Sequence, residues 1–264
     1  MIDCMFRRSP PAGEYRVFES TDGTRSNWDP EIQHGSPPLA LLTKHIEELA
    51  ADTGLRVGRL TLDILGAIPV TTVRVRAWVE RPGSRISLMA AEMLTERADG
   101  GTRAVARVTA WLLAQSDTRD TVTDRYPPLT EGAATASPHA WAGAPGYLET
   151  VNWRRQETPA GAAAEAWMSP LVPLVDTEPT TALQRLAMVV DSANGLGAVL
   201  DPEQFLFMNT DTVVHLHRLP EGDDFGLRSR ASIGPDGVGV TNAEIFDRQG
   251  FVGTSAQTLL VLRR

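Results

Sequence analysis

The residue best placed for acid–base chemistry is Asp191. It follows the apolar segment 183–190 and precedes Asn194 and Gly195, a pair that often ends a helix. The carboxylate would then lie near the negative end of a helix dipole, where a negative charge is unfavourable. A local cost of this kind recurs at functional sites and is compatible with a general base. The alternative is an exposed aspartate that begins a turn.

Gln257 lies in a strand pattern whose other members are small or apolar. It shares a face with Ser255, Leu259 and Val261. A buried primary amide must find hydrogen-bond partners or lose about 1–3 kcal/mol. The pattern therefore indicates either a polar group in a site or a glutamine that is bonded to a neighbouring loop.

Asn209 and Thr210 begin a second strand pattern, where such residues also commonly close turns. His215 and His217 follow two residues apart on one strand face. No third residue with metal-ligand spacing accompanies these two histidines, so we predict no metal site.

Arginines could bind phosphate groups at two places. Arg81 and Arg85 flank a Pro-Gly turn that could present both guanidinium groups to an anion, and Arg154 with Arg155 forms a second candidate pair. The alternative in each case is an ordinary solvated arginine.

Composition excludes several classes of protein. The 264 residues carry a net charge of −8, which argues against a broad nucleic-acid surface. The single cysteine, Cys4, permits no internal disulfide. The absence of a long apolar run or a secretory signal predicts a cytoplasmic protein that does not enter a membrane. Nucleotide-binding glycine loops and the Gly-x-Ser-x-Gly motif of serine hydrolases do not occur.

Two helices are predicted from apolar periodicity. Residues 37–49 place Leu39, Leu42, Ile46 and Leu49 on one stripe, with Ser36 as the expected N-cap. Residues 180–190 are apolar around more of their circumference, as expected for a helix enclosed by a sheet. Residues 60–64 and 73–80 alternate between apolar and polar side chains and predict strands with one buried face.

The two halves of the chain repeat each other. The segment AEMLTERADGGTRAVARVTAWLLA from Ala91 corresponds to AEIFDRQGFVGTSAQTLLVL from Ala243, and a strand that ends at Pro69 corresponds to one that ends at Pro220. Val108 is the first-half counterpart of Gln257, so polarity at this point belongs to the second half alone. Each half reads as one helix followed by a series of strands.

The repeat predicts an α+β fold in which two tandem antiparallel sheets each wrap around a central helix. Residues 1–115 and 150–264 are the expected units, and residues 116–149, rich in Pro, Ala, Gly, Thr and Asp, are the expected linker. A curled sheet leaves an open edge, and two units side by side can cover each other's edges. A ligand pocket is expected at the seam between them.

These features together resemble the double-hotdog acyl-CoA thioesterases, from about Trp28 to Arg264. The similarity rests on HGSPPLAL at 34–41, ERPGSR at 80–85, VVDSANGL at 189–196, FMNTDTVVHLHR at 207–218 and SAQTLLVLRR at 255–264. Each motif is short, and their order and spacing carry the resemblance. One departure is Ser36, which replaces the second glycine of the family's His-Gly-Gly motif.

The resemblance implies a catalytic group made of Asp191, Gln257 and Asn209, with Thr210 beside it. It also implies that His34, Gly35 and Ser36 bind substrate and supply a backbone amide to the oxyanion. Pro37 and Pro38 have no amide hydrogen, so Gly35, Ser36 and Leu39 are the candidate donors. Arg81 and Arg85 are candidates for binding the phosphates of coenzyme A.

The expected function is therefore hydrolysis of an acyl-CoA thioester to a free acid and CoA, with Asp191 acting as general base or as direct nucleophile. We expect no cofactor beyond the CoA of the substrate, a role in lipid metabolism, and assembly into a homo-oligomer. A non-catalytic acyl-ligand binding protein is one alternative. A hydratase or dehydratase is another, and it requires a pocket histidine paired with aspartate, for which His34 is the candidate.

Overall fold

The structure is a computed structural model, and it describes residues 2–97, 99–135 and 145–264. The helices are α1 (Ser36–Ala50), α2 (Ala182–Val190) and α3 (Ala193–Leu196). The strands of the first half are β1 (Phe6–Ala12), β2 (Tyr15–Ser20), β3 (Leu55–Ile64), β4 (Thr72–Arg81), β5 (Ile86–Glu96) and β6 (Thr102–Ala114). Those that follow are β7 (Ala134–Thr135), β8 (Val151–Gln156), β9 (Ala164–Pro170), β10 (Phe205–Asn209), β11 (Asp211–Leu216), β12 (Phe225–Ile233), β13 (Val238–Asp247) and β14 (Gly250–Arg263).

The sheet has the same strand order in both halves. The first half runs β1-β2-β4-β5-β6-β3, and the second runs β11-β14-β13-β12-β9-β8-β7, with β10 also paired to β14. Read outward from the seam, β3 corresponds to β11 and the hairpin β5–β6 corresponds to β13–β14. The expected duplication is therefore confirmed.

The two halves join edge to edge at β3 and β11. These strands pair antiparallel, with Leu60 opposite Val214 and Leu62 opposite Thr212. The strands that would otherwise be open edges therefore satisfy each other's backbone hydrogen bonds. The predicted mutual covering of the two units takes this form.

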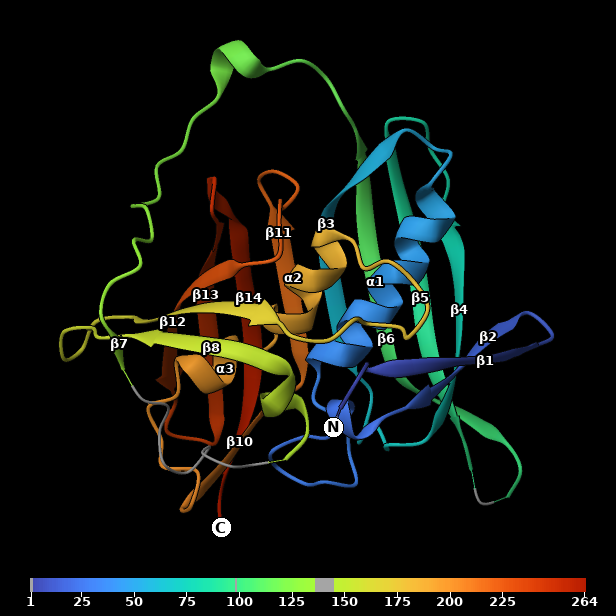
Figure 1. The fold of residues 1–264 in the computed structure, drawn as a ribbon, viewed down its shortest axis with the longest axis horizontal. Helices are drawn as coiled ribbons and strands as arrows, with labels where there is room; N and C mark the ends of the chain where they lie inside the picture. The colour runs from blue at the N-terminus through green and yellow to red at the C-terminus, as the bar shows by residue number, and fades with distance from the viewer. Residues whose placement is uncertain (1, 98, 136–144) are drawn as a thin grey trace.

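The helices α1 and α2 lie side by side against the sheet and run in opposite directions (Figure 1). Their apolar residues form one continuous core with inward-facing residues of both halves, including Leu42, Ile46, Leu186 and Val190. Thr181 and Gln184 form a capping box at the start of α2. The N-cap of α1 is Gly35 and Ser36 is its first helical residue, so the helix begins one residue earlier than predicted.

A hairpin precedes each helix, and the sequence analysis did not predict either one. Pro10 and Pro11 occupy β1, which forms the outer edge of the first half, where a missing amide donor is tolerated. The hairpin β8–β9 occupies the equivalent place in the second half.

Residues 116–135 of the predicted linker are mostly exposed and run past the second half, whereas Tyr147 near its end is buried. Leu129 packs into a small cluster with Trp167, Phe246 and Phe251, and β7 pairs with β8. Residues 136–144 of the linker lie outside the described part. The domain bounds 1–115, 116–149 and 150–264 remain a prediction.

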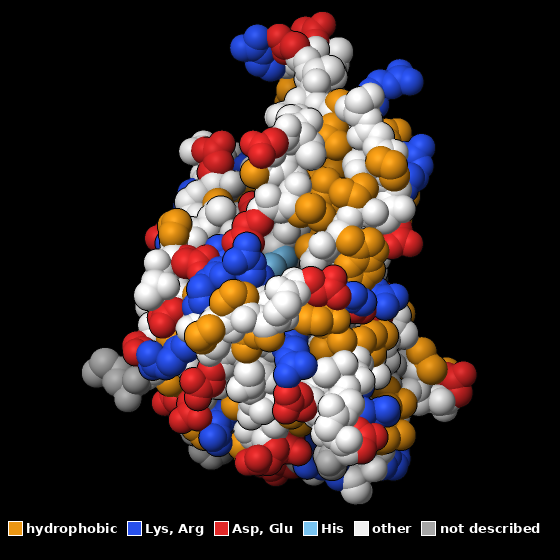
Figure 2. Space-filling view, turned by 90° about the vertical axis from the view of Figure 1, so that its right-hand side faces the viewer, with side chains coloured by type: hydrophobic (Ala, Val, Ile, Leu, Met, Phe, Trp, Pro, Cys, Tyr) orange, Lys and Arg blue, Asp and Glu red, His pale blue; other side chains and the backbone are white. Residues whose placement is uncertain are grey.

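The surface mixes charged and apolar side chains. Figure 2 shows apolar side chains gathered in the upper part of one face, with acidic and basic side chains around them. In the part of the chain that the structure describes, no helix combines the length and the apolar character needed to cross a bilayer.

Gly253 offers a test of the pairing between β11 and β14. A side chain at this position would collide with the carbonyl oxygen of His215 on the neighbouring strand, and a backbone atom cannot rotate away. We expect Gly253→Ala to lower the free energy of unfolding by about 2–3 kcal/mol in urea titrations. Gly195→Ala is the control, since its added methyl group meets open space within α3 and should leave stability unchanged or higher. Equal stability of both variants would contradict the register.

Candidate active site

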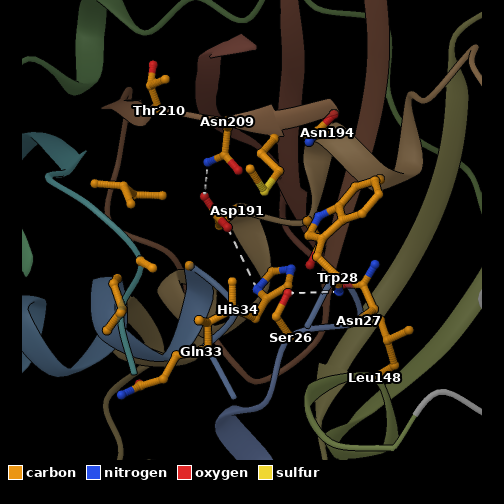
Figure 3. Close-up of a pocket in the computed structure, with 18 of the residues that line it drawn as sticks. Ser26, Asn27, Trp28, Gln33, His34, Leu148, Asp191, Asn194, Asn209 and Thr210 are labelled. Atoms are coloured by element: carbon orange, nitrogen blue, oxygen red, sulfur yellow. Dashed lines mark hydrogen bonds and ion pairs between the residues drawn. The ribbon is translucent and has the colours of Figure 1, made fainter. Parts of the chain in front are cut away.

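A cavity of about 500 Å³ lies at the seam, beside the start of α1 and the end of α2. Residues of both halves line it: Ser26, Asn27, Trp28, Ile32, Gln33, His34, Gly35, Ile64, Gly66, Ala67 and Ile68 from the first, and Leu148, Glu149, Trp153, Arg155, Asp191, Ser192, Asn194, Gly195, Leu196, Met208, Asn209, Thr210 and Leu260 from the rest of the chain. Most of the wall is apolar. Polar groups gather around Asp191 (Figure 3).

Asp191 is the C-cap of α2 and only 3% of its surface is exposed. Its Oδ1 atom accepts hydrogen bonds from Asn209 Nδ2 at 2.8 Å, from Gln257 Nε2 at 3.2 Å and from the Thr212 hydroxyl. Gln257 Nε2 also donates to the backbone carbonyl of Asp191 at 2.9 Å. The three side chains thus hold the carboxylate through one oxygen, which leaves Oδ2 for the opposite side.

The Oδ2 atom faces the start of α1. A side chain on Gly35 would collide with it, and His34 Nδ1 lies 3.7 Å away. The negative end of α2 and the charge of Asp191 therefore meet the positive, amino-terminal end of α1. This helix end compensates for the unfavourable position that the sequence indicated for Asp191.

His34 is held in one tautomer. The backbone amide of Ser36 donates to His34 Nδ1 at 3.1 Å, so this nitrogen is an acceptor and the proton of the neutral ring lies on Nε2. Burial lowers the pKa of His34, while the charge of Asp191 acts in the opposite direction. Among the described residues, Nε2 has no hydrogen-bond partner, so its N–H is available to a ligand.

Tyr147 supports both sides of this arrangement. Its ring stacks on His34 with centroids 3.8 Å apart, and its hydroxyl donates to the Met188 carbonyl and contacts the Ser192 hydroxyl. Tyr147 thereby links the histidine before α1 to the last turn of α2. It was absent from the predicted site because it lies in a linker without regular periodicity.

The predicted polar group is largely brought together, with one exchange. Asp191, Gln257 and Asn209 meet. Thr210 also lines the cavity, but it is exposed, points away from Asp191 and is hydrogen-bonded to Asp211 and Thr258 (Figure 3). Thr212 takes its place and is fully buried. The signal was available: Thr212, Val214 and Leu216 share the inward face of β11 by simple alternation.

Of the predicted oxyanion donors, Gly35 remains the best placed. The amide of Ser36 is engaged by His34, and the amide of Leu39 donates within α1 to the Gly35 carbonyl. The Gly35 amide has no acceptor among the described residues and lies at the cavity wall.

The end of the second helix also differs from the prediction. The helix α2 ends at Val190, and Asn194 does not begin a turn but lies within α3.

Arg81 and Arg85 do not reach the cavity. They flank the turn between β4 and β5, which lies at the same end of the sheet as the start of β3, whereas Ile64 at the end of β3 lines the cavity. Eight residues of extended strand separate the two ends by roughly 26 Å.

His215 and His217 are exposed, and within the described ranges no three His, Cys, Asp or Glu side chains are grouped to hold a metal.

The opposite ends of the two helices form a matching junction with different chemistry. Glu47 near the end of α1 accepts hydrogen bonds from Thr181 and Gln184 at the start of α2. Glu47 thus occupies a place comparable to that of Asp191, but its partners are the helix-capping groups themselves. The two junctions therefore differ, and Asp191 is the one that faces the cavity.

Comparisons with known proteins agree with this architecture. The family model of the acyl-CoA thioesterase N-terminal domain matches residues 24–113, and that of the C-terminal domain matches residues 123–261. A search of curated protein sequences gave no match.

Solved structures with similar folds include a hot dog fold protein from Alicyclobacillus acidocaldarius, at 14% identity and a TM-score of 0.70, with 97% of this chain and 95% of that chain covered. An acyl-CoA thioesterase II from Mycobacterium marinum matches at 14% identity and a TM-score of 0.65, with the same coverage of both chains. The dehydratase domain of RzxB from Pseudomonas fluorescens matches at 13% identity and a TM-score of 0.57, covering 97% of this chain and 96% of that chain. These similarities confirm the α+β double-hotdog fold.

The lowered pKa of His34 predicts a pH dependence of stability. Below the unfolded value of about 6.5, the unfolded chain binds a proton that folded His34 does not, so stability falls as pH drops, by up to about 1.4 kcal/mol per pH unit. Burial also lowers the pKa of His45, which adds a similar slope. Urea titrations at several pH values should show a shallower slope for His34→Gln than for the wild type. His45→Gln is the matched control that retains the contribution of His34, and an unchanged slope in His34→Gln would contradict the assignment.

Proposed function

This chain belongs to the acyl-CoA thioesterase family, and we propose that it hydrolyses the thioester bond of an acyl-CoA to give a free acid and CoA. The observation that carries the proposal is the placement of Asp191. Its carboxylate is fixed through Oδ1 by three side chains, while Oδ2 faces Gly35 and His34 at the wall of the seam cavity.

In the proposed reaction, Asp191 Oδ2 takes a proton from a water molecule, and the resulting hydroxide attacks the thioester carbonyl carbon. Asn209, Thr212 and Gln257 keep the carboxylate in place through Oδ1. Collapse of the tetrahedral intermediate breaks the carbon–sulfur bond, and the proton returns to the departing thiolate. The alternative, direct attack by Asp191 to form an anhydride, requires the same placement of Oδ2.

The developing oxyanion would accept hydrogen bonds from the Gly35 amide and from His34 Nε2. The Gly35 amide lies at the positive end of α1, where backbone donors favour negative charge. His34 is suited to donate because its tautomer is fixed by Ser36. The apolar wall, which includes Trp28, Ile68 and Leu260, would enclose the acyl chain.

The thioesterase proposal predicts different losses of activity for three variants. Asp191→Asn should lower kcat/KM on an acyl-CoA by about 10²- to 10⁴-fold, the usual contribution of a general base. Thr212→Val should lower kcat/KM by about 10-fold because the carboxylate loses a hydrogen bond, whereas Thr210→Val should retain most activity. Release of CoA, followed with a thiol-reactive dye, measures each rate.

Full activity of Asp191→Asn would remove Asp191 from the mechanism. Tight binding of acyl-CoA without CoA release by the wild type would instead indicate a non-catalytic acyl-ligand binding protein. Hydrolysis in isotopically labelled water under single-turnover conditions would distinguish the base from the nucleophile, since only the anhydride route places a label in Asp191.

A second candidate function is hydration or dehydration of an acyl thioester. The observation in its favour is that His34, from the first half, and Asp191, from the second, lie 3.7 Å apart at the cavity wall. A base that removes a proton from carbon needs a free lone pair, but His34 Nδ1 is bonded to the Ser36 amide and Nε2 carries the proton. The tautomer therefore favours hydrolysis.

The two candidates can be separated with a 3-hydroxyacyl-CoA. We expect the wild type to release CoA from it and to form no enoyl-CoA, because neither nitrogen of His34 is free to act as base. Chromatography of the reaction mixture measures both products. Accumulation of enoyl-CoA that is lost in His34→Ala would support the dehydratase instead.

A further inference from the structure

Among the described residues that line the cavity, Arg155 is the one lysine or arginine. It lies on β8 and is half-buried, and its Nη2 atom donates to the carbonyl oxygen of Leu196 at 3.3 Å. Burial lowers the pKa of its guanidinium group. No carboxylate of the described residues forms an ion pair with it.

The neighbouring Arg154 shows what a structural arginine looks like on the same strand. Arg154 forms ion pairs with Glu131 and Asp224, and Arg248 binds the same two carboxylates. The charge of Arg154 is therefore paired with two carboxylates of the fold. Arg155 differs because most of its donors have no acceptor among the residues that the structure describes.

The segment outside the described part offers no acidic partner for Arg155. Residues 136–144, which lie outside the described part, contain no Asp or Glu. Glu149 also lines the cavity, but its Oε2 atom accepts a hydrogen bond from the Gly146 amide and it forms no ion pair with Arg155 in the described structure. A partly desolvated cation without a counter-ion is costly, and an anion bound in the cavity would remove that cost.

Arg155 lies within reach of a substrate held at Asp191. Asp191 and Ser192 form a turn between α2 and α3, and the five residues from Asp191 to Leu196 can span at most about 18 Å. The Leu196 carbonyl contacts Arg155 directly, and Arg155 and Asp191 line the same cavity. Trp153 and Leu196 beside it line the same cavity and provide an apolar path between the two groups.

We propose that Arg155 binds the terminal carboxylate of the acyl chain, so that the preferred substrates are thioesters of dicarboxylic acids. This inference rests on the proposed thioesterase function. A single guanidinium matches a single carboxylate, with which it can form two parallel hydrogen bonds. The phosphates of coenzyme A carry several negative charges, and one half-buried arginine is a poor match for them.

The test compares CoA thioesters of a dicarboxylic and a monocarboxylic acid of equal chain length. We expect the wild type to have the higher kcat/KM for the dicarboxylic substrate. Arg155→Gln should lower that value by about 10- to 100-fold, as for loss of a charge-assisted hydrogen bond, and leave the monocarboxylic substrate nearly unchanged. Arg155→Lys should restore part of the preference, and Arg85→Gln, an exposed arginine at the far end of the sheet, is the control.

Two further measurements identify other roles of Arg155. Equal losses on both CoA substrates, absent with the matching pantetheine thioesters, would place Arg155 on the phosphates and overturn the proposal. Equal losses on every substrate would show a structural role and overturn it as well.

Calorimetric binding of the free dicarboxylic acid, compared with the monocarboxylic acid, tests the anion site even if no thioester is hydrolysed. Arg155-dependent preference for the dicarboxylic acid would support the proposal, and no preference would refute it.

Discussion

The contact between the carboxyl end of α2 and the amino end of α1 is the interaction on which the site depends. The two helices run antiparallel, so a negative helix end and a positive helix end meet at Asp191 and Gly35. The carboxylate is unfavourable in the context of α2 alone and favourable in the context of the pair. Gly35 permits this approach because any side chain there would occupy the position of the carboxylate oxygen.

The remaining polar groups follow from strand geometry around that contact. Thr212 and Gln257 lie on adjacent strands, β11 and β14, and both project inward toward the end of α2. Gln257 binds both the last carbonyl of the helix turn and the side chain of Asp191, so one residue caps the helix and orients the carboxylate. The same hydrogen bonds that satisfy the end of α2 therefore also hold the carboxylate of Asp191, and this makes the polar group rigid.

Duplication followed by divergence explains why the chain has one such site. Both helix junctions carry an acidic residue, but Glu47 is bound by the capping residues Thr181 and Gln184, and Val108 stands where the second half has Gln257. The junction at Asp191 instead has a free carboxylate oxygen, a fixed histidine tautomer and an adjoining cavity. Two halves of similar fold therefore form a site at the Asp191 junction and a purely structural contact at the Glu47 junction.

The sequence by itself determined the duplication, the helix segments and the inward face of the last strand, because each depends on local periodicity or on paired motifs. The grouping of Asp191, Asn209 and Gln257 was implied by the resemblance to the acyl-CoA thioesterases. Alternation along β11 could have placed Thr212 on the inward face, but only the tertiary structure decided that it meets Asp191. The tertiary structure also decided that the Ser36 amide is taken by His34, that Tyr147 supports both helices, and that Arg155 rather than Arg81 or Arg85 reaches the cavity. These outcomes depend on which strand ends and loops converge in space. A one-residue change of position along β11 turns a side chain to the other face, and that choice is fixed by pairing with β3 and β14 rather than by the residue itself.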